Sequence, residues 1–343
     1  MSPPRNRQIV LAARPVGLPK PSDFRLVETP MPEPGAGELL VRALYLSLDP
    51  YMRGRMSDAR SYARPVAIGE VMVGAVVGEV VRSSHPDFAE GEVVEDRLGW
   101  QEYGLSRGRE ARKIDPSLGP VSTALGVLGM PGLTAYFGLL EVGRPRPGET
   151  VVVSAASGAV GAAVGQIARI AGCRVVGLAG SKVKVDYLVD ELHFDAGIDY
   201  KTADLDAALA DACPRGVDVY FDNVGGQVTE AVSRHVNPFA RIAVCGLISQ
   251  YNLEKPELAP RNERFVLVNR VRVQGFIVSD FYGRRDEALG QLADWVRQGR
   301  LRYREDIVDG LDNAPAAFIG MLQGKNFGKQ LVRLAGPRAP ERR

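Results

Sequence analysis

Hydrophobic residues follow two different spacings along the chain. In residues 1 to about 125 they form short, often alternating runs separated by turn residues, and residues 39–48 are the clearest example. The run over 73–81 contains Gly74 and Gly78, which is typical of a bent strand in a small barrel. Since few of these segments have helical spacing, the pattern predicts an irregular β domain.

From about residue 126, short apolar runs alternate with stretches of helical spacing. Six apolar runs separated in this way predict a doubly wound parallel sheet with helices between its strands. After a last helix over 287–297, strand and turn signals return as far as residue 334, and we expect this end to complete the β domain. We therefore predict an α/β protein of two domains: residues 1–125 completed by 300–343, and a dinucleotide-binding Rossmann domain over 126–299. The six runs lie at 151–154, 174–178, 196–198, 217–221, 242–246 and 271–276.

The first of these runs opens a glycine-containing turn. The sequence from Val151 reads V-V-V-S-A-A-S-G-A-V-G, and helical spacing follows it. Strand, turn and helix in this order are the context of a dinucleotide fingerprint, in which Gly158 admits a pyrophosphate and Gly161 lets the helix pack close to the sheet. Free N–H groups at the helix start favour phosphate. Ala156 stands where the fingerprint has its first glycine, so a tight turn without a ligand is the alternative from this stretch alone.

The charge balance argues against several classes of partner. The chain carries 43 Lys and Arg against 41 Asp and Glu, which disfavours a broad nucleic-acid or membrane-binding surface. No apolar run reaches transmembrane length and the N-terminus lacks the apolar core of a signal peptide, so we expect a cytoplasmic protein. The three cysteines and three histidines are not closely spaced, which disfavours a dedicated zinc site.

The second strand of the sheet domain ends in residues that favour NADP over NAD. An NAD site needs Asp or Glu about 20 residues past the glycines for the ribose hydroxyls. This chain instead has Gly180 and Ser181 followed by Lys182 and Lys184, which leave space and positive charge for a 2′-phosphate. A charge-assisted hydrogen bond contributes about 1.5–3 kcal/mol, so two or three such contacts would discriminate strongly. The alternative is a solvated helix start, although lysine there opposes the helix dipole.

Candidate side chains also follow the later strands, at the sheet edge where such folds bind ligands. Asn223 follows the fourth strand directly and precedes a pair of glycines. Tyr251 lies just beyond the fifth strand, where a phenol would reach a bound cofactor or substrate. The sixth strand leads into G-F-I-V-S, whose backbone would line the nicotinamide end. Each segment alone is compatible with an ordinary loop, and their common position makes them candidates.

These motifs, in this order, resemble the medium-chain dehydrogenase/reductase superfamily. The chain is similar to its zinc-independent branch of NADPH-dependent 2-alkenal, leukotriene and prostaglandin reductases and curcumin-reductase-type bacterial enone reductases. Zinc-dependent members carry a Gly-His-Glu near the position of Gly69 and Glu70, and the histidine is absent here. The resemblance spans nearly the whole chain. It rests on eight stretches: D-P-Y-M-R-G-R-M from Asp49, M-P-G-L-T-A-Y from Met130, A-A-S-G-A-V-G from Ala155, G-S-K-V-K from Gly180, D-Y-K-T from Asp199, F-D-N-V-G-G from Phe221, G-L-I-S-Q-Y-N from Gly246 and G-K-N-F-G-K-Q from Gly324.

The resemblance implies a fold and a set of roles. It implies a GroES-like β-barrel domain in addition to the Rossmann domain, a homodimer formed through the sheet domain, and NADPH as the cofactor. Tyr251 would lie beside the nicotinamide ribose and the substrate carbonyl, and Tyr51 at the substrate pocket. The cofactor contacts that it implies are Gly158, Ala159, Val160 and Gly161 for the pyrophosphate; Gly180, Ser181, Lys184 and Tyr200 around the 2′-phosphate; and Asn223, Cys245, Phe276, Ile277, Val278 and Asn326 elsewhere along NADPH.

The activity implied is conjugate reduction of α,β-unsaturated ketones and aldehydes. The β-carbon takes a hydride from NADPH, and negative charge then develops on the carbonyl oxygen. A donor aimed at that oxygen typically lowers the barrier by about 3–4 kcal/mol, and Tyr251 is the candidate. Either Tyr251 or water would protonate the α-carbon. Two alternatives stay open, an NADPH quinone reductase of the same superfamily and an NADPH-binding protein without catalytic activity, while a zinc alcohol dehydrogenase is disfavoured.

Overall fold

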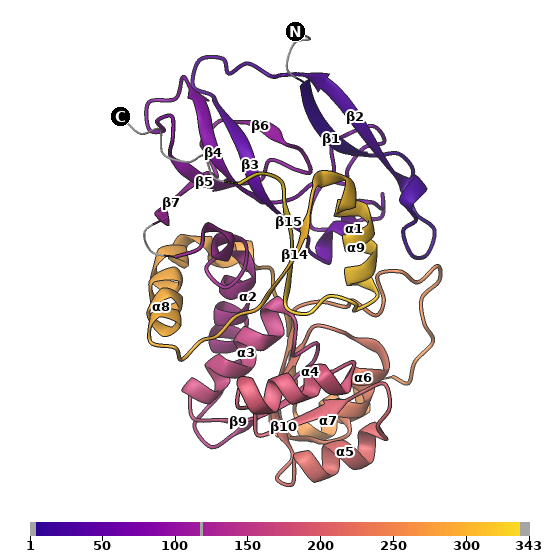
Figure 1. Cartoon of the computed structure of the whole chain (residues 1–343). Coiled ribbons are helices and arrows are strands. Elements are labelled where there is room, and N and C mark those ends of the chain that lie inside the picture. The colour runs from indigo at the N-terminus through magenta and orange to yellow at the C-terminus, as the bar shows by residue number, and fades with distance from the viewer. Residues whose placement is uncertain (1–4, 117–118, 262, 337–343) are drawn as a thin grey trace. The chain divides into compact units, whose positions relative to one another are not determined.

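The computed structural model describes residues 5–116, 119–261 and 263–336. The chain divides into two compact units. The first unit consists of the described residues up to Leu125 and from Glu305 onward, and the second of Gly126–Arg304. Each unit contains a β-sheet, and helices are concentrated in the second (Figure 1). The predicted α/β class is confirmed.

The second unit is built on a six-stranded parallel sheet. Its strand order is β10-β9-β8-β11-β12-β13, so the order of the strands reverses between β8 and β11. Ligands of doubly wound sheets bind at the carboxyl ends of the strands at such a reversal. This is the topology that the alternating apolar runs predict. The strands are β8 (Thr150–Val153), β9 (Arg174–Ala179), β10 (Ala196–Asp199), β11 (Val217–Asp222), β12 (Val236–Val244) and β13 (Arg272–Gly275).

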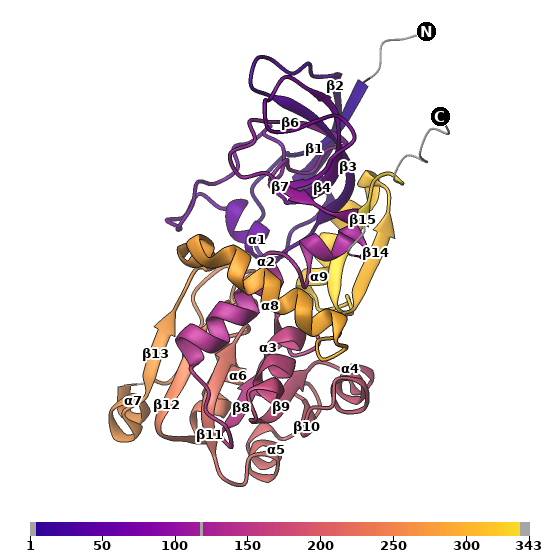
Figure 2. The same ribbon diagram turned by 90° about the vertical axis from the view of Figure 1, so that its left-hand side faces the viewer.

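Helices connect these strands and pack in groups (Figure 2). The helix α2 packs against α3 and α8, and α5 packs against α6. Within the described part of the chain, no helix is both long and apolar enough to cross a membrane. The helices are α2 (Met130–Phe137) with its π-helical continuation η4 (Gly138–Gly143), α3 (Ala159–Ile170), α4 (Lys182–Asp186) with its π-helical continuation η5 (Tyr187–Glu191), α5 (Leu205–Ala212), α6 (Gly226–Ser233), α7 (Glu263–Asn269), the 3-10 segment η6 (Val278–Arg284) and α8 (Arg285–Arg297).

The centre of this sheet is completely buried. Val151, Val152 and Val153 have no exposed surface, and the same is true of Tyr220 and Phe221 on the neighbouring β11. Burying a valine side chain stabilises a fold by about 1.5–3 kcal/mol. The carboxyl ends of β8 and β11 are therefore firm supports for the side chains that follow them.

The first unit is built on a mainly antiparallel sheet. Its strands follow the order β14-β15-β3-β4-β5-β7, with β6 paired to β3, while β1 and β2 form a separate two-stranded sheet. An added Cβ at Gly78 on β4 would lie 2.4 Å from the carbonyl oxygen of Arg42 on β3, so this close approach requires glycine. The elements are β1 (Arg5–Leu11), β2 (Phe24–Pro30), β3 (Leu39–Ser47), α1 (Tyr51–Arg55), β4 (Val76–Ser83), β5 (Val93–Asp96), β6 (Tyr103–Ser106), β7 (Arg112–Ile114), β14 (Glu305–Asp309), α9 (Ala314–Leu322) and β15 (Lys329–Arg333).

The C-terminal part of the first unit departs from the prediction. The sequence shows strand and turn signals after residue 297, but α9 is a helix of nine residues. Pro315 lies in its first turn, where the missing N–H breaks no helical hydrogen bond. Phe318 packs edge-on against Trp100 and Phe24, with ring centroids 5.6 and 6.2 Å apart. Burial of this apolar face stabilises a helix that is too short to be evident from periodicity.

Candidate cofactor site

The turn after β8 has the close packing that a dinucleotide fingerprint requires. Gly161 lies in the first turn of α3, where an added Cβ would be 2.4 Å from the carbonyl oxygen of Ala155. A side chain at this position would push the helix away from the strand. Ala156, which occupies the position of the missing first glycine, is fully buried. An added Cβ at Gly177 on β9 would lie 3.0 Å from the Ala156 methyl group, so this glycine makes room for the alanine.

The N-terminus of α3 follows this turn. Gly158 is the N-cap residue in an extended conformation, and no side chain caps the helix. The N–H groups of Ala159, Val160 and Gly161 in the first turn carry the positive end of the helix dipole. These are the donors that a pyrophosphate would use.

The ends of β9 and β10 form the neighbouring part of the sheet edge. An added Cβ at Gly180 would lie 3.1 Å from the hydroxyl oxygen of Tyr200, so the phenol lies close to the glycine. Burial, and secondly the charge of Asp199, raises the pKa of Tyr200. Ser181 is the N-cap of α4 and Lys184 is half-buried in its first turn. The four candidates for 2′-phosphate binding thus lie on adjacent segments.

Two further lysines, Lys182 and Lys201, lie near the four candidates for 2′-phosphate binding, and their environments differ. The ammonium nitrogen of Lys182 lies 2.8 Å from both carboxylate oxygens of Asp186, so its charge is already paired. Sequence reasoning misses Lys201, whose Cε would be 3.1 Å from a Cβ added at Gly180. The D-Y-K-T motif contains this lysine, but only the pairing of β10 with β9 reveals that it approaches Gly180.

A buried carboxylate organises the turn at the end of β11. Asp222 is 1% exposed, and its Oδ1 accepts hydrogen bonds of 2.9 Å from the N–H groups of Val224 and Gly225 and from the Tyr220 hydroxyl. Its Oδ2 accepts a hydrogen bond of 2.6 Å from the Thr229 hydroxyl. Sequence reasoning does not single out Asp222, although a charged residue at the end of an apolar run is a usable signal. The carboxylate fixes the backbone on which Asn223 is carried.

Asn223 and Cys245 link the strands at the reversal point. The side-chain amide of Asn223 donates to the Ser154 carbonyl at 2.8 Å, and its backbone N–H donates to the Ser154 hydroxyl at 2.9 Å. The backbone N–H of Cys245 donates to the Asp222 carbonyl at 2.8 Å. Burial, with a smaller effect of the Asp222 charge, raises the pKa of Cys245 to about 12, so the thiol stays neutral at physiological pH. The ends of β8, β11 and β12 are therefore joined by hydrogen bonds.

Tyr251 lies over the end of β12. Its hydroxyl accepts a hydrogen bond of 3.3 Å from the backbone N–H of Leu247. An added Cβ at Gly246 would be 3.3 Å from the same hydroxyl and 3.5 Å from the Asn223 carbonyl oxygen. The absence of a side chain at Gly246 therefore lets the phenol approach the ends of β11 and β12.

Phe276 has a packing role that the sequence does not indicate. Its ring lies 6.1 Å from the Phe221 ring between centroids, and an added Cβ at Gly138 would be 2.2 Å from it. The side chain thus fills the space between the end of β13 and the start of η4. Ile277 and Val278 follow Phe276 after the end of β13, Val278 begins η6, and all three residues are half-buried.

Two candidates belong to the first unit. Tyr51 begins α1, and burial together with the charge of Asp49 raises its pKa above the usual range. The guanidinium carbon of Arg55 lies 5.8 Å from the centre of the Tyr51 ring. Asn326 lies between α9 and β15, where its side-chain amide donates to the Gly328 carbonyl at 2.9 Å. These two residues therefore come from a different unit than the strand-end candidates.

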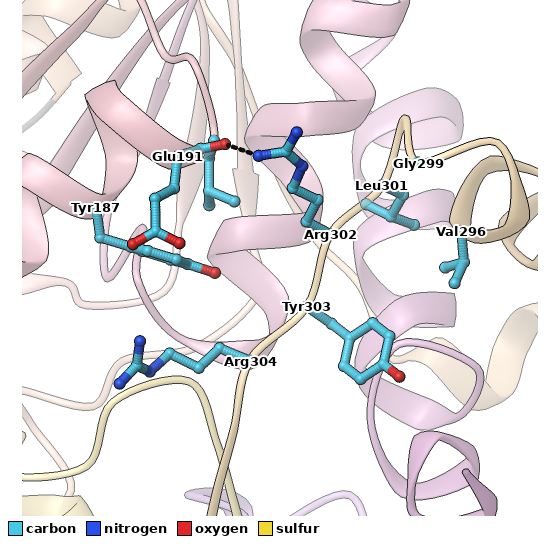
Figure 3. A pocket seen from close by; sticks show the side chains of 9 residues that line it. Tyr187, Glu191, Val296, Gly299, Leu301, Arg302, Tyr303 and Arg304 are labelled. Carbon is cyan, nitrogen blue, oxygen red and sulfur yellow. Dashed lines mark hydrogen bonds between the residues drawn. The ribbon is translucent and has the colours of Figure 1, made fainter. Parts of the chain in front are cut away.

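The second unit also contains a cavity of about 390 Å³ that no candidate residue lines. It lies between η5 and the segment after α8 (Figure 3). The Arg302 side chain donates to the Glu191 carbonyl at 3.0 Å, as drawn in Figure 3. The Gln166 side chain accepts from the Arg302 backbone N–H and donates to its carbonyl, both at 2.8 Å. These bonds hold the last segment of the unit in place, and the cavity lies beside that segment.

The described residues contain no group of three or more His, Cys, Asp or Glu side chains that is placed to hold a metal ion.

Comparison with protein families gives two matches. Residues 7–114 match a family described as the N-terminal domain of oxidoreductase, and residues 159–296 match one described as zinc-binding dehydrogenase.

Individual proteins match over nearly the full length of the chain. An NADPH-dependent curcumin reductase of Escherichia coli is 51% identical over 97% of this chain and 98% of its own. A 2-alkenal reductase (NADP(+)-dependent) of Nicotiana tabacum is 43% identical over 95% and 97%. The crystal structure of CurA in complex with NADPH from Vibrio vulnificus is 51% identical, with a TM-score of 0.93 over 96% of this chain and 100% of that one. The chain belongs to the medium-chain dehydrogenase/reductase superfamily, in the branch of the curcumin and 2-alkenal reductases.

Proposed function

We propose that this protein uses NADPH to reduce the C=C bond of α,β-unsaturated ketones and aldehydes. The observation that carries the proposal is the alignment of nearly the whole chain with two reductases. The chain is 51% identical to an NADPH-dependent curcumin reductase and 43% identical to an NADP(+)-dependent 2-alkenal reductase. Tyr200 and Lys201, which lie close to Gly180, and Lys184 on the helix that follows it support a 2′-phosphate at this point, since they offer a phenol and two cations where an NAD site has a carboxylate.

The residues at the sheet edge fit the parts of the cofactor in order. The first turn of α3 would hold the pyrophosphate, and the segments at Gly180 and Tyr200 would hold the phosphorylated ribose. Asn223, Cys245 and the backbone from Phe276 to Val278 would contact the nicotinamide half, with Asn326 as a further contact. The close packing at these two glycines supports this assignment: Gly161 lets α3 lie against the turn after β8, and the absence of a Cβ at Gly180 lets the Tyr200 and Lys201 side chains approach.

The chemistry assigned to the chain is stabilisation of an enolate. Bound NADPH supplies the hydride that reaches the β-carbon of the substrate. The Tyr251 hydroxyl donates a hydrogen bond to the carbonyl oxygen, and this bond strengthens as negative charge develops there. A well-placed donor of this kind lowers the barrier by about 3–4 kcal/mol. Tyr51, whose phenol is neutral at physiological pH, would line the substrate pocket.

The direct test is NADPH consumption with a panel of enones, alkenals, quinones and simple alcohols, repeated with NADH. We expect turnover of enones and alkenals with a clear preference for NADPH. Faster turnover of quinones would favour a quinone reductase, and NADPH binding without turnover of any substrate would favour a non-catalytic protein. Indifference to NADPH, measured by calorimetry, would contradict both the cofactor and the activity.

We also propose that the protein is a cytoplasmic homodimer that assembles through the second unit. The strand β13 lies at one edge of the sheet, and Val273 on it is 48% exposed. Leu267 on α7, which packs against the neighbouring β12, is 77% exposed. An exposed edge with apolar side chains is a surface that a second copy would cover. Light scattering of Val273→Lys tests the assembly, since the added charge should shift the protein to monomer. Cell fractionation tests the cytoplasmic location.

A further inference from the structure

Asp49 and Lys329 form a buried ion pair in the first unit. The lysine Nζ lies 2.7 Å from Asp49 Oδ1, and the two side chains are 4% and 7% exposed. The ammonium group also donates to the Leu48 carbonyl at 2.7 Å, while the Ser47 hydroxyl donates to the other oxygen of Asp49. Because a buried ion pair costs much of its attraction in lost hydration, it contributes little net stability. Its place in the fold is the more informative property.

The pair joins two distant segments, each of which carries a candidate site residue. Asp49 lies two residues before Tyr51, and its carbonyl accepts a 3.1 Å hydrogen bond from the Met52 N–H in the first turn of α1. Lys329 begins β15 and lies three residues after Asn326.

The paired residues are 280 positions apart in the sequence. The backbone of β15 pairs with β3 beside them, with Leu331 opposite Ser47, and the Leu48 N–H donates to the Gln330 carbonyl at 3.2 Å. The ion pair extends this connection beyond the paired strands to the residues just before α1.

We propose that Asp49 and Lys329 are positioning residues that hold Tyr51 and Asn326 in their working places. The inference rests on the proposed function, because that proposal assigns the substrate to Tyr51 and the cofactor to Asn326. If one partner is removed, the other becomes an uncompensated buried charge and moves toward water. That movement displaces the start of α1 or the start of β15. A single substitution would therefore weaken the binding of two different ligands.

Lys329→Met and Asp49→Asn test this inference through the two Michaelis constants. A displaced Tyr51 or Asn326 makes a poorer contact with its ligand, so we expect each KM, for NADPH and for the enone, to rise about tenfold or more, as for the loss of one ligand hydrogen bond. The matched control is Glu79→Gln, which breaks the Arg42–Glu79 ion pair of 2.8 Å in the same sheet, with side chains 17% and 15% exposed. The control should lower the melting temperature and leave both KM values unchanged.

Either KM remaining within about twofold of the wild-type value in folded Lys329→Met would overturn the inference. Should the single charge variants not fold, Ser47→Ala removes one hydrogen bond without stranding a charge, and it should raise both constants by a smaller factor. Unchanged constants in that variant would then be the contrary result. A wild-type protein that binds NADPH but turns over no enone contradicts the proposed activity instead, and NADPH affinity of Lys329→Met by calorimetry still decides the Asn326 half of the inference.

Discussion

The two units place their candidate residues in different ways. In the second unit, each candidate follows one strand of a parallel sheet, and the carboxyl ends of those strands lie along one edge. In the first unit, the segments of Tyr51 and Asn326 are joined by a buried ion pair between residues 280 positions apart. The first arrangement follows from short-range sequence order, and the second depends on a long-range contact. Substitutions in the second unit should therefore have separable effects, each confined to one part of the cofactor or one step.

Tyr251→Phe should give the largest effect and the cleanest separation. Removing the hydroxyl removes the donor to the developing oxyanion, so we expect the chemical step to slow about a hundredfold or more while NADPH affinity changes little. Single-turnover hydride transfer and calorimetric NADPH binding measure the two quantities. Tyr303→Phe, in the segment after α8, is the matched control and should leave the rate unchanged. An unaltered single-turnover rate in Tyr251→Phe would exclude Tyr251 from this role.

Gly161→Ala tests whether the turn after β8 is as tightly packed as its geometry indicates. The new Cβ would be 2.4 Å from the Ala155 carbonyl oxygen, so α3 must shift, and overpacking of this kind costs about 1–3 kcal/mol. Denaturant unfolding and NADPH titration should show lower stability and weaker binding together. Gly290→Ala, in the exposed middle of α8 where nothing lies within 4 Å of the new atom, should instead stabilise by about 0.5–1 kcal/mol. Equal effects of the two substitutions would contradict the packing argument.

Lys184→Ala should alter the choice of cofactor and nothing else. Loss of one partly exposed charge-assisted contact to the 2′-phosphate should raise KM for NADPH about tenfold. NADH has no phosphate at this position, so KM for NADH is the internal reference and should stay within about twofold. A proportional loss with both cofactors would mean that the lysine supports the fold of α4 and not the phosphate.

The sequence predicts the second unit better than the first. The runs of apolar residues in the second unit predict its strands, and Asn223 and Tyr251 follow from their places after those strands. Lys201 could not be found in this way, because its approach to Gly180 depends on the pairing of β10 with β9. The spacing along the chain does not indicate the helix α9, because tertiary packing of Phe318 stabilises it. The Asp49–Lys329 pair also lies beyond sequence-based prediction, because no spacing along the chain indicates which distant charges form an ion pair.

Lys201→Ala should have the smallest effect of these substitutions. Lys201 is exposed, so its attraction to a 2′-phosphate is screened, and we expect KM for NADPH to rise only about two- to fivefold at low salt. At about 0.5 M salt the difference from wild type should disappear. Lys182→Ala is the matched control on the neighbouring segment, because Lys182 is already paired with Asp186 and should affect NADPH binding little at either salt concentration. A larger effect of Lys182→Ala than of Lys201→Ala would show that the second cation at the 2′-phosphate is Lys182 on α4 and not Lys201 after β10.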